Sequence, residues 1–184
     1  MVESKPYRAP CTAGSKMSKY DGDLLSDPAK YRHIVGVLQY ATLTRPDIAY
    51  SVNQLCQHMH APTSTYLIVA KRVLRYLKGT LNLGLYYCKG PITLTAFCDV
   101  DWAGNPDDRN STIGYGVFLG SNLISWSAKK QHIVSRSSTE VEYKSLSLTI
   151  TKLFWLRMLL KELHISLPSP PIIWCDNSSA LVLA

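Results

Sequence analysis

Residues 91–99 of the chain are PITLTAFCD, residues 114–119 are GYGVFL and residues 123–128 are LISWSA. Every second residue from Ile92 to Cys98 is apolar, an alternation that predicts a β-strand with one buried face. The other two stretches are predicted strands that the turn residues 120–122 (GSN) connect as a hairpin. These three stretches therefore predict three strands joined by hairpin connections.

Downstream, the apolar period lengthens and predicts a long helix from Ser137 to Leu163. Its inward stripe is predicted to consist of Leu146, Ile150, Leu153, Leu156, Leu160 and Leu163. Residues 172–175 (IIWC) predict a fourth strand, and residues 178–184 open another helix. Since a helix precedes the fourth strand, this strand can lie parallel to the first and beside it. The sequence thus predicts an α/β fold with a mixed sheet.

Upstream, residues 27–80 predict three short helices. The first follows the cap signal Asp27-Pro28 and extends to Leu43, the second restarts at Arg45-Pro46-Asp47 and continues through Met59, and the third ends at Gly79. Residues 1–26 show little periodicity and are predicted to be an extended or mobile lead-in. We therefore divide the chain into a lead-in (1–26), a helical segment (27–80) and an α/β domain (81–184).

The positive charge is concentrated in the helical segment. The whole chain has 20 basic and 13 acidic residues, a net charge of +7. Residues 27–80 hold seven basic residues against Asp27 and Asp47, a net charge of +5. Such a segment indicates a polyanionic partner, of which nucleic acid is the commonest, although a solvated helix surface explains the charge equally well. The cations predicted on the outer side of the third helix are Lys71, Arg72, Arg75 and Lys78.

Composition excludes several classes of protein. With 46% apolar and 18% charged residues, the chain is neither disordered nor collagen-like nor a simple coiled coil. It has no apolar run long enough to span a bilayer and no secretory signal, which favours a cytoplasmic or nuclear location. Five cysteines without a Cys-x-x-Cys pair argue against a disulfide framework or a zinc ribbon. Cys98 and Cys175 are predicted to be small buried core residues.

Three carboxylates stand out by their position. Asp99 is predicted to end the first strand and Asp176 the fourth, so parallel strands would bring both to one sheet edge. Glu142 lies four residues before Leu146 on the inward stripe, where a carboxylate needs a base or a metal ion as partner. Glu140 instead fits a capping box with Ser137 and an ion pair with Lys144.

Each of the three acids also has a simpler explanation. Asp176 can cap the helix that follows it, Asp99 can cap a turn, and Glu142 can pair with a surface lysine. Their convergence at one end of the sheet favours a metal site. Carboxylates without His or Cys partners suit Mg²⁺ or Mn²⁺, and two such ions form a site that cleaves phosphodiesters.

The sequence resembles a copia-type retrotransposon polyprotein, from the tail of its reverse transcriptase into its RNase H domain. The resemblance covers about residue 27 to the last residue. The matching stretches are residues 31–36 (YRHIVG), 43–48 (LTRPDI), 74–80 (LRYLKGT), 99–104 (DVDWAG), 124–126 (ISW), 137–143 (SSTEVEY) and 175–177 (CDN).

The resemblance implies an RNase H-like fold in which Asp99, Glu142 and Asp176 are the catalytic residues and the ligands of Mg²⁺ or Mn²⁺. It favours Glu142 over Glu140, because residues 142–146 (EYKSL) fit the family's Glu-x-x-Ala-Leu helix start. The implied activity is hydrolysis of the RNA strand of RNA–DNA hybrids. The basic helices resemble the thumb and connection that grip template and primer, and Trp102 is a further candidate for substrate contact, with loop packing as its alternative.

The chain departs from the family pattern at both ends. The polymerase palm lies upstream of the matching region, so we expect no DNA synthesis, and the rest of a reverse transcriptase is an expected partner. The family's fifth strand and fourth acid come after residue 184, so the sequence predicts an α/β domain truncated before the fifth strand. The alternative function is therefore a non-catalytic remnant that binds nucleic acid through residues 27–80, and the sequence alone leaves enzymatic activity undecided.

Overall fold

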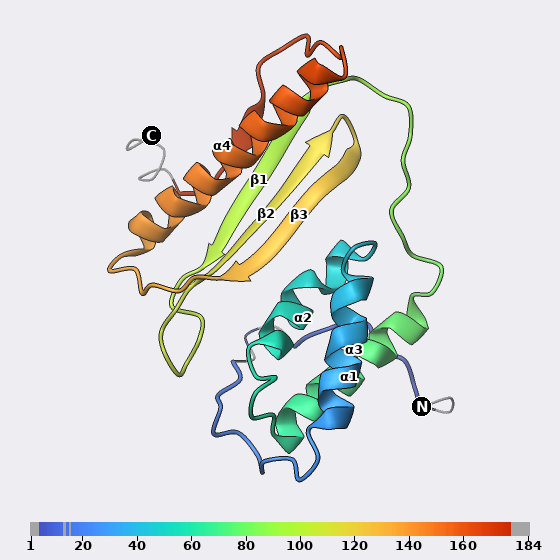
Figure 1. Ribbon diagram of the computed structural model, residues 1–184, viewed down its shortest axis with the longest axis vertical. Helices are drawn as coiled ribbons and strands as arrows, with labels where there is room; N and C mark the ends of the chain where they lie inside the picture. The colour runs from blue at the N-terminus through green and yellow to red at the C-terminus, as the bar shows by residue number, and fades with distance from the viewer. Residues whose placement is uncertain (1–3, 13, 15, 178–184) are drawn as a thin grey trace. The chain divides into compact units, whose positions relative to one another are not determined.

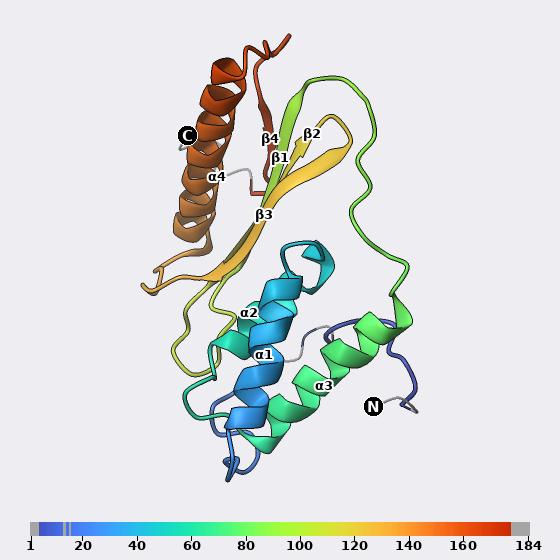
Figure 2. The same cartoon turned by 45° about the vertical axis from the view of Figure 1, so that its right-hand side comes forward.

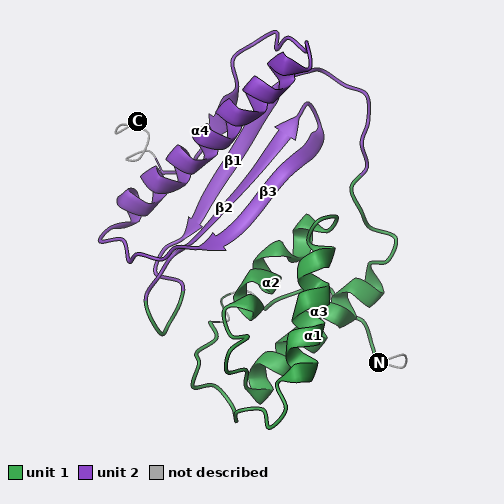
Figure 3. Cartoon of the chain, in the orientation of Figure 1, with its two compact units in different colours: residues 1–85, 105–108 green, residues 86–104, 109–184 purple. Residues whose placement is uncertain are grey.

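The computed structural model describes residues 4–12, 14 and 16–177. The chain divides into two compact units (Figure 3). Unit 1 comprises residues 1–85 and 105–108, and unit 2 comprises residues 86–104 and 109–184. Each unit has a hydrophobic core of its own. The two are described separately below.

Unit 1 is helical. It contains α1 (Ala29–Ala41), the short 3₁₀ helix η1 (Pro46–Ile48), α2 (Ala49–Cys56) and α3 (Ser64–Gly79) (Figure 1). The three predicted helices are confirmed, but α1 and α2 end two to three residues before the predicted positions. Asp27 accepts a hydrogen bond from the amide of Ala29 at 2.9 Å, as the cap signal predicted. The core side chains are Tyr31, Val35, Leu38, Ile48, Val52, Leu55, Tyr66, Ala70, Val73 and Tyr76.

The break between α1 and α2 is held by a half-buried ion pair. Arg45 donates to both carboxylate oxygens of Asp47, at 2.9 and 2.7 Å, and to the carbonyl of Thr80 at 3.0 Å. The hydroxyl of Tyr76 donates to Asp47 at 2.7 Å. Because Arg45 is only 9% exposed, these bonds are needed to satisfy its guanidinium. The motif that interrupts the first helix thus also ties η1 to the end of α3.

Unit 2 is built on a four-stranded mixed sheet. Its strands are β1 (Leu94–Asp101), β2 (Thr112–Leu119), β3 (Asn122–Lys130) and β4 (Ile172–Trp174). Their order is β3-β2-β1-β4, with β1–β2 and β2–β3 antiparallel and β4 parallel to β1 (Figure 2). The predicted α/β class, with three antiparallel strands and a parallel fourth, is therefore confirmed. The helix predicted over 178–184 lies outside the described residues.

The strands that carry Asp99 and precede Asp176 have different ends from those predicted. β1 begins at Leu94 and continues to Asp101, because its antiparallel partner β2 extends to Thr112, which pairs with Asp101. Asp99 therefore lies inside the strand, not at its end. β4 ends at Trp174, so Asp176 lies two residues beyond it. The prediction that each of these acids terminates its strand is wrong by two residues.

The helix α4 (Ser138–Glu162) packs against one face of the sheet (Figure 2). Leu94, Ala96 and Val117 of the sheet form a core with Leu153, Leu156 and Leu160 of the helix. Two members of the predicted stripe are wrong, since Ile150 is 48% and Leu163 60% exposed. Thr149 is buried in place of Ile150, and its hydroxyl is satisfied there because it donates to the carbonyl of Ser145 at 2.8 Å. Leu163 lies beyond the end of the helix.

Candidate active site

The sheet places Asp99 on the face opposite the core. Side chains alternate along β1, so the buried residues Leu94, Ala96 and Cys98 face α4, whereas Phe97 and Asp99 are exposed. One carboxylate oxygen of Asp99 accepts a hydrogen bond from the amide of Val100 at 2.8 Å. Asp99 thus has a solvent-facing carboxylate with room for a further ligand.

Glu142 occupies the first turns of α4, which a strong N-terminal cap positions. The side chain of Ser137 accepts from the amide of Glu140 at 3.1 Å, and Glu140 pairs with Lys144 at 2.6 Å. Glu140 accepts from the amide of Arg136, one residue earlier than in a standard capping box. The assignment of Glu140 to capping is therefore confirmed, and Glu142 is left to point inward.

Glu142 is a buried carboxylate with an unsatisfied oxygen. It is 8% exposed, and its Oε2 atom has no hydrogen-bond partner. Burial raises the pKa of Glu142 to about 7, and the negative charges of Asp176 and Asp99 contribute further. A cation at this position would supply the missing partner and lower the cost of the buried charge.

Asp176 joins the other two acids. Trp174 of β4 pairs with Phe97 of β1, and the two strands are parallel. The segment that follows Trp174 therefore lies beside the end of β1. Ligand atoms of Glu142, Cys175 and Asp176 all lie within 4.8 Å of one another. Within the described residues this group does not include Asp99, which nevertheless lies close enough to Glu142 to raise its pKa.

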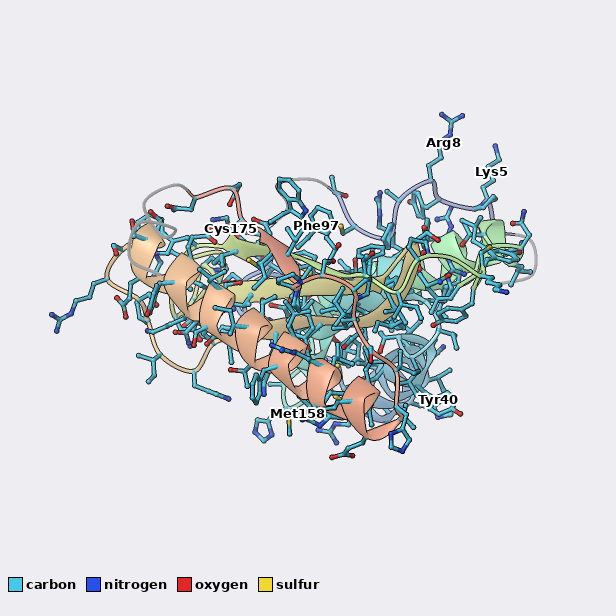
Figure 4. The ribbon with its side chains drawn as sticks, turned by 90° about the horizontal axis from the view of Figure 1, so that it is seen from above. Lys5, Arg8, Tyr40, Phe97, Met158 and Cys175 are labelled. Carbon is cyan, nitrogen blue, oxygen red and sulfur yellow. The ribbon has the colours of Figure 1, made fainter. Side chains whose placement is uncertain are left out.

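Asp99 and Asp176 line a common open pocket of about 520 Å³. Its remaining lining residues are Phe97, Cys98, Gly114, Tyr115, Gly116, Trp174 and Cys175. Phe97 and Trp174 are more than half exposed, and Figure 4 shows Phe97 on the opposite side of the sheet from α4. Sequence reasoning missed these two aromatic residues, although the alternation along β1 already placed Phe97 away from the core.

The thiols differ from expectation at one of two positions. Cys98 is buried as predicted, and burial together with the neighbouring Cys175 raises its pKa to about 11. Its Sγ atom lies 3.7 Å from the carbonyl oxygen of Trp174. Cys175 is only half-buried and belongs to the cluster with Glu142 and Asp176, so its assignment to the core is wrong.

Three of the four basic side chains of α3 that were predicted to bind nucleic acid instead donate hydrogen bonds to backbone carbonyls of the same chain. Residues 4–11, here called the N-terminal arm, lie along α3. Arg72 donates to the carbonyls of Ala9 and Cys11, Arg75 to that of Lys5, and Lys78 to that of Ser4. Lys71 is exposed, as is Trp102 at 46%. The arm, which was predicted to be extended or mobile, therefore docks on the basic side of α3.

Tyr7 is the centre of this contact. Its ring centroid lies 4.4 Å from the guanidinium carbon of Arg72 and 4.0 Å from that of Arg75. Gly79 allows the arm to approach, since a Cβ atom there would lie 2.7 Å from the Cβ of Pro6. Lys5 and Arg8 project outward from the arm (Figure 4). The arm thus brings two further cations to a helix that is already basic.

Within the described residues, the structure has no helix that is both long and apolar enough to cross a membrane.

The mixed sheet, the single long helix across it and the carboxylates at the β1–β4 edge define an RNase H-like α/β unit. The Pol polyprotein of transposon RE1 of Arabidopsis thaliana is 51% identical over 184 residues, which is all of this chain and 13% of the relative. The polyprotein of transposon RE2 of the same plant is 50% identical over 184 residues, again all of this chain and 13% of the relative. The chain therefore belongs to the copia-type retrotransposon polyproteins, of which it spans only a small part.

A third relative matches this chain over most of its own length. Secreted RxLR effector protein 161 of Plasmopara viticola is 41% identical over 128 residues, which cover 68% of this chain and 90% of that protein. No protein-family model matches the chain, and no solved structure matches it either.

Proposed function

We propose that unit 2 is a metal-dependent nuclease of the RNase H type, which hydrolyses the RNA strand of RNA–DNA hybrids. The observation that carries this proposal is the buried, unpartnered oxygen of Glu142 next to the exposed carboxylate of Asp176. Asp99 lines the same pocket as Asp176. Three carboxylates at one sheet edge fit a hard divalent cation, with Asp99, Glu142 and Asp176 as its expected ligands.

The chemistry divides between the cation and the protein. A bound Mg²⁺ or Mn²⁺ would supply an activated water and stabilise the charge of the leaving oxygen. The Ser137 cap and the packing of α4 position Glu142. Asp99 and Asp176 keep an open side toward solvent, where a phosphodiester can enter. Phe97 and Trp174 offer apolar surface to the sugar or base of the substrate.

Hybrid specificity follows from the family resemblance. Such enzymes recognise a duplex by its minor-groove width and by 2′-hydroxyl groups, without reading the base sequence. We therefore expect cleavage of RNA–DNA hybrid, and no cleavage of DNA duplex, which lacks the 2′-hydroxyl.

The test measures cleavage of three kinds of duplex by the parent chain and by the variant Asp99→Asn. The purified chain is incubated with labelled hybrid, RNA duplex and DNA duplex in Mg²⁺. The proposal predicts cleavage of the RNA strand of the hybrid alone, and loss of that cleavage in Asp99→Asn. Absence of cleavage, or cleavage that Asp99→Asn leaves unchanged, would refute it.

The second candidate function is nucleic-acid binding by unit 1 without catalysis. It is favoured by the basic row Lys71, Arg72, Arg75 and Lys78 on α3, three members of which already bind backbone carbonyls of the arm. Phosphate oxygens would accept stronger, charge-assisted bonds from the same groups. This function predicts an affinity for hybrid that falls steeply with salt, and binding that is absent or independent of salt would exclude it.

A further inference from the structure

The cluster beside β4 contains a sulfur atom as well as two carboxylates. Glu142 comes from α4, and Cys175 and Asp176 come from the chain directly after β4. The three ligand atoms lie within 4.8 Å of one another, close enough to contact a single ion together. Glu142 is buried, Cys175 is half-buried and Asp176 is exposed. The cluster is therefore closed to solvent on the side of Glu142 and open to solvent on the side of Asp176.

The cluster is missing a partner on its closed side. Oε2 of Glu142 is buried without a hydrogen bond. Buried polar atoms in folded proteins are almost always paired, so an unpaired carboxylate oxygen next to two further ligand atoms indicates a ligand. A cation satisfies it directly.

The sulfur of Cys175 changes which cation fits. Mg²⁺ prefers ligands that are all oxygen, whereas thiolates select softer ions such as Zn²⁺ and Cd²⁺. A second thiol, Cys98, neighbours Cys175 but is buried and lies outside the cluster, with its Sγ atom 3.7 Å from the carbonyl oxygen of Trp174. Cys175 is therefore the thiol that can act from the open side.

We propose that Glu142, Cys175 and Asp176 form a binding site for one thiophilic divalent cation, of the class of Zn²⁺ or Cd²⁺. Two carboxylates and one thiolate are three protein ligands, which leaves a fourth tetrahedral position for water. When the metal–sulfur bond forms, the thiol proton passes to solvent. Since Glu142 and Asp176 are shared, the soft ion excludes a hard ion from these residues. That competition rests on the proposed nuclease function, whereas the binding of the soft ion does not.

The experiment is a titration of the full chain with Cd²⁺, followed by the ultraviolet absorption of the cadmium–thiolate bond. We expect a band that saturates at about one equivalent of metal. Cys175→Ser should abolish this band, whereas Cys88→Ser, which changes an exposed thiol outside the cluster, should leave it intact. Glu142→Gln retains every thiol and should weaken cadmium binding by about tenfold. Circular dichroism of each variant verifies that it is folded.

The results separate this inference from the nuclease proposal. A band of equal size in Cys175→Ser, or no band in the parent chain, overturns the thiophilic site even if hybrid is cleaved in Mg²⁺. A band that depends on Cys175 supports the site even if no hybrid is cleaved. Where cleavage does occur, Cd²⁺ should inhibit the parent chain at a lower concentration than it inhibits Cys175→Ser. Equal inhibition of the two would show that the Cys175 thiol does not bind the inhibiting ion, which overturns the thiophilic site.

Discussion

A carboxylate oxygen of Glu142, at the buried start of α4, lies within 4.8 Å of one from Asp176, which is exposed after β4. Two like charges at this distance, one of them shielded from water, repel each other unless a proton or a cation intervenes. Burial raises the pKa of Glu142 to about 7, and the negative charges of Asp176 and Asp99 add to the increase. The consequences of that pair can be measured in the absence of any substrate.

The stability of the metal-free chain should depend on pH through Glu142. Its pKa is about 7 in the folded state against 4.5 for the ordinary value, so between these pH values the folded state holds a proton that the unfolded state has lost. Stability from this group is therefore lost as the pH rises from about 4.5 to about 7. In chelator, Glu142→Gln should gain thermal stability relative to the parent chain across that range. A difference in Tm that is the same at both ends of the range would contradict this assignment.

Divalent cations should stabilise the folded chain. At pH 8, Mg²⁺ in excess is expected to raise Tm, because a ligand that binds only the folded state adds RT ln(1 + [L]/Kd). Glu142→Gln and Asp176→Asn should reduce the increase. Glu162→Gln removes an exposed acid from the same helix and serves as the matched control. Equal increases in all four proteins would place the ion elsewhere.

The aromatic residues of the pocket should contribute to substrate binding and not to the chemical step. Trp174→Ala is expected to raise KM for hybrid by roughly fivefold, which corresponds to about 1 kcal/mol of lost stacking, with little change in kcat. Phe97→Ala should act in the same direction. Phe154→Ala truncates an exposed aromatic side chain on α4 away from this pocket and should leave KM unchanged. A fall in kcat alone would argue against a binding role.

Weakening the N-terminal arm should strengthen nucleic-acid binding by unit 1. Tyr7→Ala removes the ring between Arg72 and Arg75 and leaves the core intact. Such contacts are worth about 0.5–1 kcal/mol, so the affinity for hybrid at low salt should rise roughly two- to fivefold. Tyr40→Ala, at an exposed position of α1, is the control. Lower affinity in Tyr7→Ala would mean that the arm is part of the binding surface.

Most of the fold follows from local patterns in the sequence. Alternation along β1 identifies its buried face, Ser137 and Glu140 mark the start of α4, and the helix before β4 makes it parallel to β1. The buried stripe of α4 is harder to predict, because the helix carries apolar residues on all of its faces. Phe154, Trp155 and Met158 are all close to half exposed or more, so composition does not separate its faces.

Contacts between residues far apart in the sequence could not be predicted from local sequence patterns. Arm docking depends on guanidinium groups reaching backbone carbonyls more than sixty residues away, and carbonyls carry no sequence signal. At the candidate site, Glu142 and Asp176 were found because helix and strand patterns each placed one of them. The apolar run 172–175 predicts a buried Cys175 at the end of the fourth strand. In the structure β4 ends at Trp174, one residue before Cys175.

If the carboxylates at the β1–β4 edge form a nuclease site, single-turnover cleavage of a labelled RNA–DNA hybrid in Mg²⁺ measures its activity. The parent chain and Glu162→Gln are expected to cleave the RNA strand at equal rates. Asp176→Asn should be slower by about a hundredfold or more, as expected when a ligand of a catalytic metal is lost. Equal rates in Asp176→Asn and the parent chain, or no cleavage by any of the three, would contradict the account.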